Sequence, residues 1–597
     1  MPPSAPSRLP LELLGVILEQ LATHAHAQDL EDGDISLEDS RIARTALARC
    51  ARASRSFHEQ AIRILWREQQ MGHACDAVLS NFDFGSVKWP EQDEGTWGGG
   101  PESDDEANDD MAVGIDPYDY PFTYKYVSGP ITTEEWSRFE YYAQFVRVLR
   151  YLNEETIDPS VFFYLQQHAR GKPLFLNLRE LVWEHATPEV ASVITPTISI
   201  LRLPEDHGEE ENGSQLREFG YRMRRHTFKQ LLPSILERLP ELEELELRAF
   251  GHEAFWFPFI STPHGRFVIQ TLRTLRIRES RRALMRVALA ALSTIEGLAE
   301  LKIDLDERGG VHDPAADHDK GMPPVRAFAN LKHLQIEGRT TGVAAVFAAI
   351  AAPGLEVIEL TCGGWQSDPE RGRIPMVENA LSTIFGQLRR RNAASLQKLH
   401  LALRQFDEPL FLGDTAPDTP PLNVLASPLL ELRHLQDLQI HQYELTVGYS
   451  RVNVPALVAA WPMLRSLALP NVLINLESLQ LVSRTCPKLE SLTVKTIIWH
   501  SSDIAGLLDS SPSDLGPVNR GANRSALQVL RISHPWTLKT MEPDTISSIA
   551  RLLDLLYPEL IPERCSGKNT PLFEGQKSWL NIMDEVEKLQ LARRNGV

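Results

Sequence analysis

The side chains that could carry out chemistry in this sequence do not form a familiar metal-binding pattern. Imidazole and carboxylate groups both bind divalent metal ions, and they gather in one short segment, at His312, Asp313, Asp317, His318 and Asp319. This segment is rich in Gly, Pro and Asp and lies between Leu305 and Leu331, where a polar inserted loop is expected in any case. We therefore expect no metal site.

Motifs of catalysis and phosphate binding are also missing from the sequence. It contains no HExxH, GxSxG, Walker-type or GxGxxG motif. A basic cluster could bind phosphates or an import receptor, and it consists of Arg222, Arg224, Arg225 and Lys229. A helix that leaves an acidic loop often carries such charges, so we interpret the cluster as a solvated helix face. We expect a protein that is not an enzyme and has no cofactor.

The charge balance argues against nucleic acid as a partner. The 61 Lys and Arg residues face 80 Asp and Glu residues, for a net charge of −19, whereas binding to a phosphate backbone needs a net basic face. Six of the acids lie in residues 26–40 and nine in residues 91–110, and neither stretch contains Lys or Arg. We expect no nucleic-acid partner.

The cysteines and the apolar runs indicate the compartment. Five cysteines stand far apart without a CxxC pair, which is typical of a reduced, intracellular chain. The N-terminus lacks the basic start and apolar run of a signal peptide, and the longest apolar stretch, residues 342–352, is too short to span a bilayer. We expect no membrane association and a location in the cytoplasm or nucleus.

One pattern recurs from residue 146 onward, in which an apolar residue is followed three and five positions later by two more. Its copies begin at Leu178, Ile198, Leu242, Leu272, Leu298, Leu331, Leu355, Leu396, Leu435, Leu464, Leu489 and Leu527. The last two apolar residues of a copy are two apart and project from the same face of a short strand, while the residue between them faces the other way. Between copies the apolar spacing becomes helical, so each repeat predicts a strand followed by a helix.

This pattern resembles the leucine-rich-repeat family, in particular through the junction Cys486-Pro487-Lys488-Leu489. The resemblance implies an α/β fold in which an irregular solenoid occupies residues 131–535, with parallel strands on the concave side and helices on the convex side. A solenoid needs something to cover its last open core face. Residues 536–597 are expected to form this C-terminal helical cap, since Trp579, Ile582, Val586 and Leu589 fall on one helical stripe. Residues 586–591 are therefore predicted as helix although they also match the strand pattern.

A boundary precedes the array at residues 85–130. This stretch is acidic and Gly-rich at first and then rich in Tyr and Pro, and we interpret it as a largely disordered linker. Thr132 and Glu135 then form a capping box ahead of an aromatic-rich helix. Val146, Leu149 and Tyr151 are predicted to form the first strand of the array.

The N-terminal segment, residues 8–67, predicts three short helices around an acidic insertion at residues 26–40. Pro10 suits a first helical turn. Leu13, Ile17 and Leu21 form an apolar stripe, which Leu14 and Leu18 widen enough to face two surfaces. Because so short a module has little core of its own, we expect its exposed apolar face to be an interface.

The opening Leu9-Pro10-x-Glu12-Leu13-Leu14-x-x-Ile17-Leu18-x-x-Leu21 resembles that of an F-box, and Leu65-Trp66 resembles its closing signature. Residues 50–57 are similar to the middle F-box helix. An F-box ahead of irregular leucine repeats is a layout common in fungi. The resemblance implies an F-box-like module at residues 1–70 that binds a Skp-type adaptor and, through it, a cullin.

By this resemblance the protein would be a non-catalytic substrate-receptor subunit of an SCF-type ubiquitin ligase. Its adaptor-binding residues would be Leu9, Pro10, Leu13, Leu14, Ile17, Leu21, Leu65 and Trp66. The alternative is a leucine-rich-repeat interaction scaffold that has no link to ubiquitination, in which the N-terminal helices only cap the array.

The repeat pattern also predicts where a protein target binds. The residues between the core positions line the concave sheet as a mixed polar strip with few aromatic side chains, which suits an extended peptide or protein surface. We expect the target, whose identity the sequence does not give, to contact Glu244, Glu246, Arg276, Arg278, Gln335, Glu359, His400 and Gln439.

Overall fold

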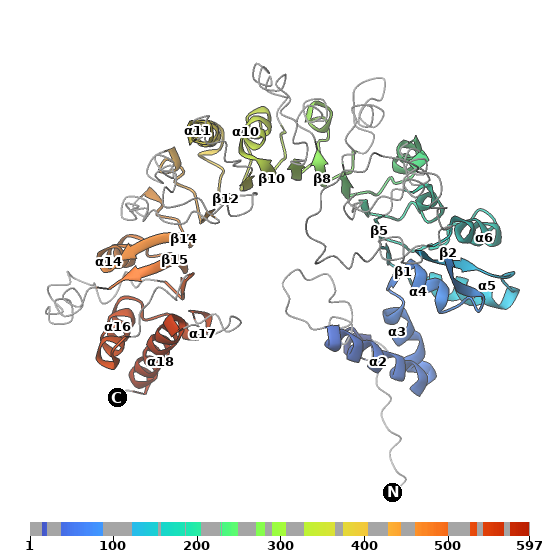
Figure 1. The fold of residues 1–597 in the computed structure, drawn as a ribbon, viewed down its shortest axis with the longest axis horizontal. Coiled ribbons are helices and arrows are strands. Elements are labelled where there is room, and N and C mark those ends of the chain that lie inside the picture. The colour runs from blue at the N-terminus through green and yellow to red at the C-terminus, as the bar shows by residue number, and fades with distance from the viewer. Residues whose placement is uncertain are drawn as a thin grey trace, which may run out of the picture. The chain divides into compact units, whose positions relative to one another are not determined.

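The computed structural model describes residues 13, 15–20, 37–87, 122–152, 157–184, 187–203, 227–228, 230–248, 270–280, 289–305, 328–363, 374–403, 428–442, 460–499, 526–533, 541–565 and 574–595. They belong to two compact units, residues 1–248 and residues 249–597. Both units are α/β, and each contains parallel strands that neighbour one another in chain order (Figure 1).

The first unit is built on a parallel sheet. Its strands are β1 (Glu68–Gln70), β4 (Val148–Tyr151), β5 (Glu180–Trp183), β6 (Ile200–Leu203) and β7 (Glu244–Arg248). Four leucines lie in register on the last four of these strands and are fully buried, namely Leu149, Leu181, Leu201 and Leu245. The strands form because each copy of the repeat supplies one such leucine to the same buried column.

Other elements of the first unit lie between or beside these strands. They are the helices α4 (Met71–Asp76), α5 (Thr133–Ala143) and α6 (Pro159–Ala169), the 3-10 helix η3 (Pro188–Ser192), and the antiparallel strands β2 (Phe82–Val87) and β3 (Phe122–Val127). The predicted capping box before α5 is confirmed. Glu135 donates its backbone N–H to Thr132 Oγ1, and the Glu135 carboxylate accepts the N–H of Thr132 at 2.8 Å.

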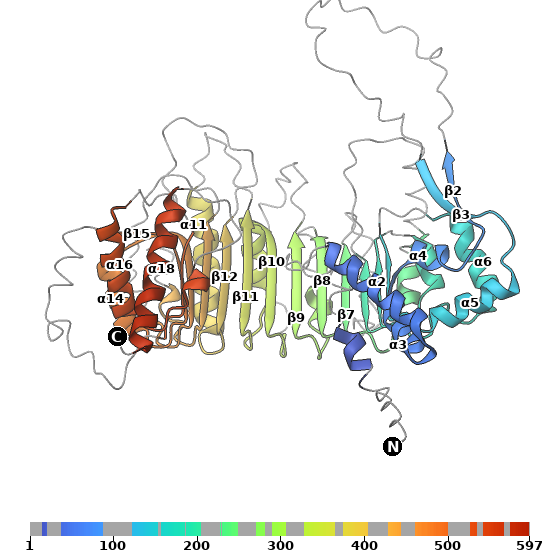
Figure 2. The same ribbon diagram turned by 90° about the horizontal axis from the view of Figure 1, so that it is seen from below.

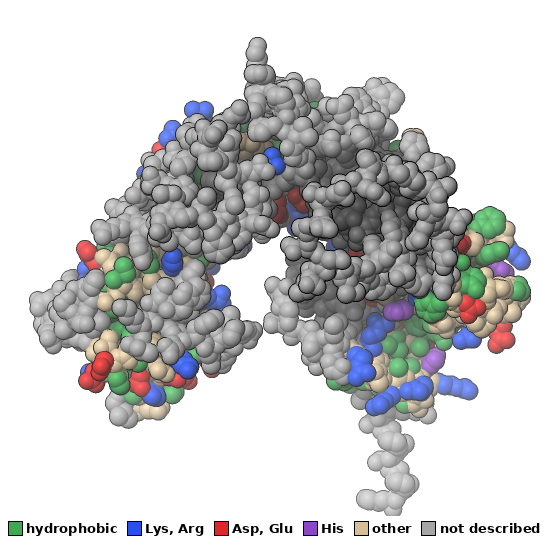
Figure 3. Space-filling model, in the orientation of Figure 1, with side chains coloured by type: hydrophobic (Ala, Val, Ile, Leu, Met, Phe, Trp, Pro, Cys, Tyr) green, Lys and Arg blue, Asp and Glu red, His purple; other side chains and the backbone are tan. Residues whose placement is uncertain are grey.

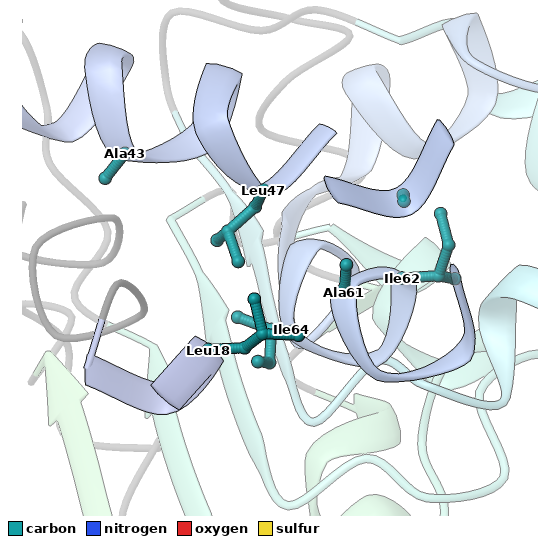
Figure 4. Close-up of a cluster of buried hydrophobic side chains, with 7 residues drawn as sticks. Leu18, Ala43, Leu47, Ala61, Ile62 and Ile64 are labelled. Atoms are coloured by element: carbon teal, nitrogen blue, oxygen red, sulfur yellow. The ribbon is translucent and has the colours of Figure 1, made fainter. Parts of the chain in front are cut away.

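Three helical segments make up the N-terminal helical module, as predicted: residues 15–20, α2 (Leu37–Ala53) and α3 (Arg55–Leu65). Ser54 separates α2 from α3, and its hydroxyl caps α3 by accepting the N–H of Phe57. The three segments share a small core, which Figure 4 shows from one side. Its buried side chains are Leu18, Ala43, Leu47, Ala51, Ala61, Ile62 and Ile64.

The second unit contains a longer run of parallel strands, which Figure 2 shows side by side from β8 to β12. The strands are β8 (Thr274–Ser280), β9 (Glu300–Leu305), β10 (His333–Arg339), β11 (Val357–Gly363), β12 (Lys398–Leu403), β13 (Asp437–Gln442), β14 (Ser466–Asn475), β15 (Ser491–Ile498) and β16 (Val529–Ile532). All twelve copies of the repeat pattern, in both units, contain a strand that starts two residues after the copy begins. The strand prediction is therefore confirmed.

Helices follow several strands of the second unit and pack on one face of them. They are α10 (Thr340–Ala349), α11 (Ile374–Asn392) and α14 (Leu476–Thr485). Figure 1 shows α10 and α11 on the same side of β10 and β12. Side chains such as Leu334 and Ile336 of β10 are buried, whereas His333 and Gln335 alternate with them and are half-exposed. The strands thus have one apolar face and one polar face.

The last elements among the described residues are the helices α16 (Pro543–Leu556), α17 (Pro562–Cys565) and α18 (Glu574–Arg594). The prediction that residues 586–591 are helical is confirmed, and Trp579, Ile582 and Val586 of the predicted stripe are buried while Leu589 is half-buried. Next to β16, Ile561 donates its N–H to the carbonyl of Gln528 at 2.8 Å. This backbone hydrogen bond is of the same kind as those that join neighbouring strands of the sheet.

The start of the sheet differs from the prediction. The first strand is β1 at residues 68–70, outside the predicted array of residues 131–535, and β4 is its neighbour rather than the first strand. Among the three residues of β1 only Gln69 is buried, and its side-chain amide donates to the carbonyl of Leu65 at 2.6 Å. Because β1 lacks the alternation of apolar and polar residues, the sequence pattern did not predict it.

Two further boundaries also differ. Residues 85–87 are the end of β2, and residues 122–127 form β3, in which aromatic residues such as Tyr124 and Tyr126 favour extended backbone. Residues 88–121 lie outside the described residues. The predicted acidic insertion at residues 26–40 overlaps α2, which already includes residues 37–40. Acidic side chains are favourable in a first helical turn, where they meet the positive end of the helix dipole.

Candidate functional site

The helical residues 13 and 15–20 present large apolar side chains outward. Leu13, Val16 and Ile17 are 53%, 58% and 53% exposed, and residues three and four positions apart lie on one face of a helix. Leu18 points the other way, into the core of the module, and is 1% exposed. The prediction that this helix carries apolar side chains toward two surfaces is therefore confirmed for its described residues.

A fourth exposed apolar side chain belongs to the same module. Ile42, one residue before the buried Ala43 of α2, is 56% exposed. The exposure of Val16 and Ile42 could not be predicted from the sequence, because a residue's exposure depends on which face the neighbouring helix covers. We refer to Leu13, Val16, Ile17 and Ile42 as the exposed apolar residues. Isolated exposed apolar residues are common, but several on one short helix mark an interaction site.

The other predicted adaptor-binding residues are either half-buried or outside the described residues. Leu65 and Trp66 are half-buried, and both pack against the core of the N-terminal helical module. The indole of Trp66 stacks on the ring of Tyr142 in α5, with the ring centroids 4.5 Å apart and the planes 12° from parallel. This contact fixes the helical module to α5. Leu9, Pro10, Leu14 and Leu21 lie outside the described residues.

The N-terminal helical module is also basic, a property that the sequence analysis missed. Arginines recur through α2 and α3 and just beyond, at Arg41, Arg44, Arg49, Arg52, Arg55, Arg63 and Arg67. Figure 3 shows basic side chains gathered over these helices. The net negative charge of the whole chain conceals this local excess, which a count over residues 41–67 alone would have found.

Six positions on the polar face of the second unit form one row across β8 to β13. Strand register places Arg276, Lys302, Gln335, Glu359, His400 and Gln439 side by side. Five of them are predicted target-binding residues, so the structure brings these five together. Arg278, two residues after Arg276 on β8, is half-buried.

Histidines and carboxylates alternate along this face. His333 Nδ1 lies 3.1 Å from Glu300 Oε1, and His333 Nε2 lies 3.4 Å from Glu359 Oε1. His400 continues the series, with its Nε2 3.3 Å from Asp437 Oδ2 and its Nδ1 3.8 Å from Glu359 Oε1. We call Glu300, His333, Glu359, His400 and Asp437 the polar ladder; it crosses five strands.

These contacts lower the pKa values of two of the three carboxyl groups of the polar ladder, Glu359 and Asp437. The hydrogen bond from His333 lowers the pKa of Glu359, and the charge of His400 adds to this effect against the opposing effect of burial. Burial alone would raise the pKa of Asp437, but the hydrogen bond and charge from His400 outweigh it, and the pKa is lowered. Burial lowers the pKa of His441. The histidines therefore favour the ionised forms of Glu359 and Asp437.

On the polar face of the first unit, one arginine holds several carboxylates. Arg202 of β6 lies between Glu180 at 3.1 Å and Glu244 at 3.2 Å. Burial alone would lower the pKa of Arg202, but the nearby glutamates raise it. Glu246 was expected on a solvent-exposed face, and this expectation is wrong, since it is only 5% exposed and lies close enough to Arg202 to influence its pKa.

Metal binding finds no support in the part of the chain that the structure describes. No three His, Cys, Asp or Glu side chains there come close enough to hold a metal ion. The predicted inserted loop with His312 and His318, and the basic cluster at residues 222–229, lie outside that part apart from residues 227 and 228. Among the described helices, none has the length and apolarity needed to cross a membrane.

Comparison with known proteins gives no family assignment. No family model matches the chain, and no curated protein matches it.

Proposed function

We propose that this protein is a non-catalytic substrate receptor of an SCF-type ubiquitin ligase. In this proposal the N-terminal helical module binds a Skp-type adaptor, the parallel strands carry an irregular leucine-rich-repeat solenoid that presents a target, and α16–α18 cap the array. The observation that carries the proposal is the exposure of Leu13, Val16 and Ile17 on one helix face, within a segment whose sequence resembles an F-box opening.

The energetics of the exposed apolar residues favour a partner. Burying a large aliphatic side chain is worth about 1.5–3 kcal/mol, and Leu13, Val16 and Ile17 each keep more than half of their surface in water. Interfaces concentrate binding free energy in a few such buried anchors. Leu18 is buried in the module's own core, whereas Leu13, Val16 and Ile17 are exposed. The exposed side chains are therefore available to an adaptor.

The polar face suits a protein target. Its side chains are charged or polar and half-exposed, and they extend across several strands. A surface of this kind favours an extended, charged partner surface over a small apolar ligand. Its ion pairs are partly exposed, so their exchange for contacts with a target costs little.

The proposed binding to an adaptor can be tested by co-purification of the full chain with a Skp-type adaptor. Changing Leu13 and Ile17 to Ala together should abolish co-purification, since both side chains are exposed and their loss leaves the core of the module intact. The matched control is Leu555→Ala on α16, an apolar side chain that is also exposed, at 56%. It should bind the adaptor as the unchanged chain does.

Absence of binding by the unchanged chain to any Skp-type adaptor would overturn this function. The scaffold alternative has one observation in its favour, because Trp66 stacks on Tyr142 and so attaches the helical module to the strands. A scaffold would retain its target without any adaptor. For the target arm, reversing Arg276 and Arg278 to Glu should weaken capture of an identified target while leaving adaptor binding unchanged.

A further inference from the structure

A cavity of about 900 Å³ opens between the N-terminal helical module and the first strands of the same unit. Its walls come from helical residues 15–20, α3, the end of α5 and the strands β4 to β6. The charged side chains that line it are Arg63, Arg67, Arg147, Arg179, Glu19 and Glu180. Four guanidinium groups thus meet two carboxylates.

Three of these arginines are brought together by the strand register. Arg147 donates its backbone N–H to the carbonyl of Arg67 at 2.7 Å, and Arg179 donates to the carbonyl of Arg147 at 2.8 Å. Each of these arginines immediately precedes a strand, β1, β4 or β5, and neighbouring strands lie about 4.8 Å apart. The structure therefore aligns three like charges in a column, an arrangement that is unfavourable unless acidic groups compensate it.

Compensation within the protein is incomplete. Arg67 and Glu19 are 3.3 Å apart and both about half-exposed, so their ion pair contributes little. Arg179 pairs with Glu241 at 3.1 Å in a similarly exposed contact. Arg147 has no acidic partner among the described residues, and its Nη1 donates to the carbonyl of Asn177 at 3.1 Å.

The carboxylate of Glu180 also lines the cavity, and it lies 3.1 Å from Arg202 on the next strand. Arg63 is paired with Glu59 of its own helix at 2.6 Å, again in an exposed contact. The cavity therefore has an excess of positive charge, to which acidic groups of another molecule could bind.

Uncharged walls decide which kind of anion fits. Ile64, Phe145 and Val148 give the cavity apolar surface, while Gln60 and Gln144 add side-chain amides. The apolar walls provide no hydrogen bonds or charges for a bare polyphosphate. They suit a peptide, whose backbone N–H and C=O groups pair with amides while its apolar atoms are covered.

We propose that this cavity binds a short acidic peptide segment of a partner protein, with Arg67, Arg147 and Arg179 receiving its carboxylates. The site is distinct from the exposed apolar residues and from the polar ladder. The proposal does not depend on the ligase function, since it uses only the cavity and its charges.

The test is a titration of the full chain with fluorescein-labelled octaglutamate, followed by fluorescence anisotropy at low salt. The unchanged chain should bind octaglutamate and not octaglutamine, and binding should weaken as salt is added. Arg147→Glu should weaken binding at least tenfold, because it removes charge-assisted hydrogen bonds and adds repulsion. The matched control is Arg138→Glu on α5, an exposed arginine that does not line the cavity, and it should change affinity less than twofold.

A second measurement covers the case in which Arg147→Glu disturbs folding. In the unchanged chain, octaglutamate should slow the modification of Arg147 and Arg179 by phenylglyoxal, as read by mass spectrometry, without slowing that of Arg138. Equal affinity for octaglutamate and octaglutamine would overturn the proposal, as would equal losses in the two variants. Tight binding of tripolyphosphate with no binding of octaglutamate would also overturn it and would identify a small-anion site.

Discussion

Truncating Leu47 to Ala should loosen the N-terminal helical module specifically. Leu47 is fully buried in a core of seven buried side chains, of which three are alanines. Loss of a buried leucine side chain costs about 2–5 kcal/mol, including the cavity left behind. In so small a core few neighbours can relax to fill that cavity, so we expect a cost of about 3 kcal/mol in the free energy of opening the module.

Native-state hydrogen exchange measures this cost locally. A loss of about 3 kcal/mol should speed exchange of the protected amides of α2 and α3 roughly a hundredfold, while amides of β10 to β12 keep their rates. The matched control is Ile42→Ala, on the same helix but 56% exposed, which should change stability by less than about 0.5 kcal/mol.

The two variants also separate folding from recognition. If the exposed apolar residues bind an adaptor, Ile42→Ala should reduce adaptor binding with little effect on exchange. Unchanged protection of α2 and α3 in Leu47→Ala, or equal acceleration in both variants, would refute the packing described for this core.

Three further outcomes can be checked. The pKa of Glu135 is lowered to about 2, chiefly by the hydrogen bond from Ser80. The ionised carboxylate therefore stabilises the fold above the ordinary pKa of a glutamate, and this stabilisation is lost as the pH falls toward 2. Glu135→Gln should lower the melting temperature at pH 7 and make it depend less on acid pH. His333→Ala should raise the pKa of Glu359 toward its ordinary value, as NMR titration of the carboxyl carbon would show. Tyr557→Phe removes the buried hydroxyl that donates to the carbonyl of Leu479 at 2.6 Å, and calorimetry should find a loss of about 1–3 kcal/mol.

The strands could be predicted from sequence because their signal is local. Two apolar residues two positions apart, repeated twelve times, fix both the position of each strand and the face that it buries. The row that includes Arg276, Gln335 and Glu359 follows from the same spacing, once neighbouring copies pair in register. Helix signals such as the capping box at Thr132 were equally local, since the box lies within four residues.

Other features had no local signal. β1 contains no apolar alternation, and its place in the sheet depends on pairing with β4, which begins 80 residues later in the register Glu68 to Val148. The repeat pattern predicts that Glu246 faces solvent. It is buried instead, and its charge helps to raise the pKa of Arg202.

The sequence by itself determined the repeat, the strand positions and the apolar helix that includes residues 15–20. Only the tertiary structure decided that Trp66 stacks on Tyr142, that His333 stands between Glu300 and Glu359, and that Arg67, Arg147 and Arg179 align beside one cavity. The physical reason is separation along the chain. Period and propensity act over a few residues, whereas these contacts join residues from different repeats, whose meeting depends on strand register and on the lengths of the segments between them.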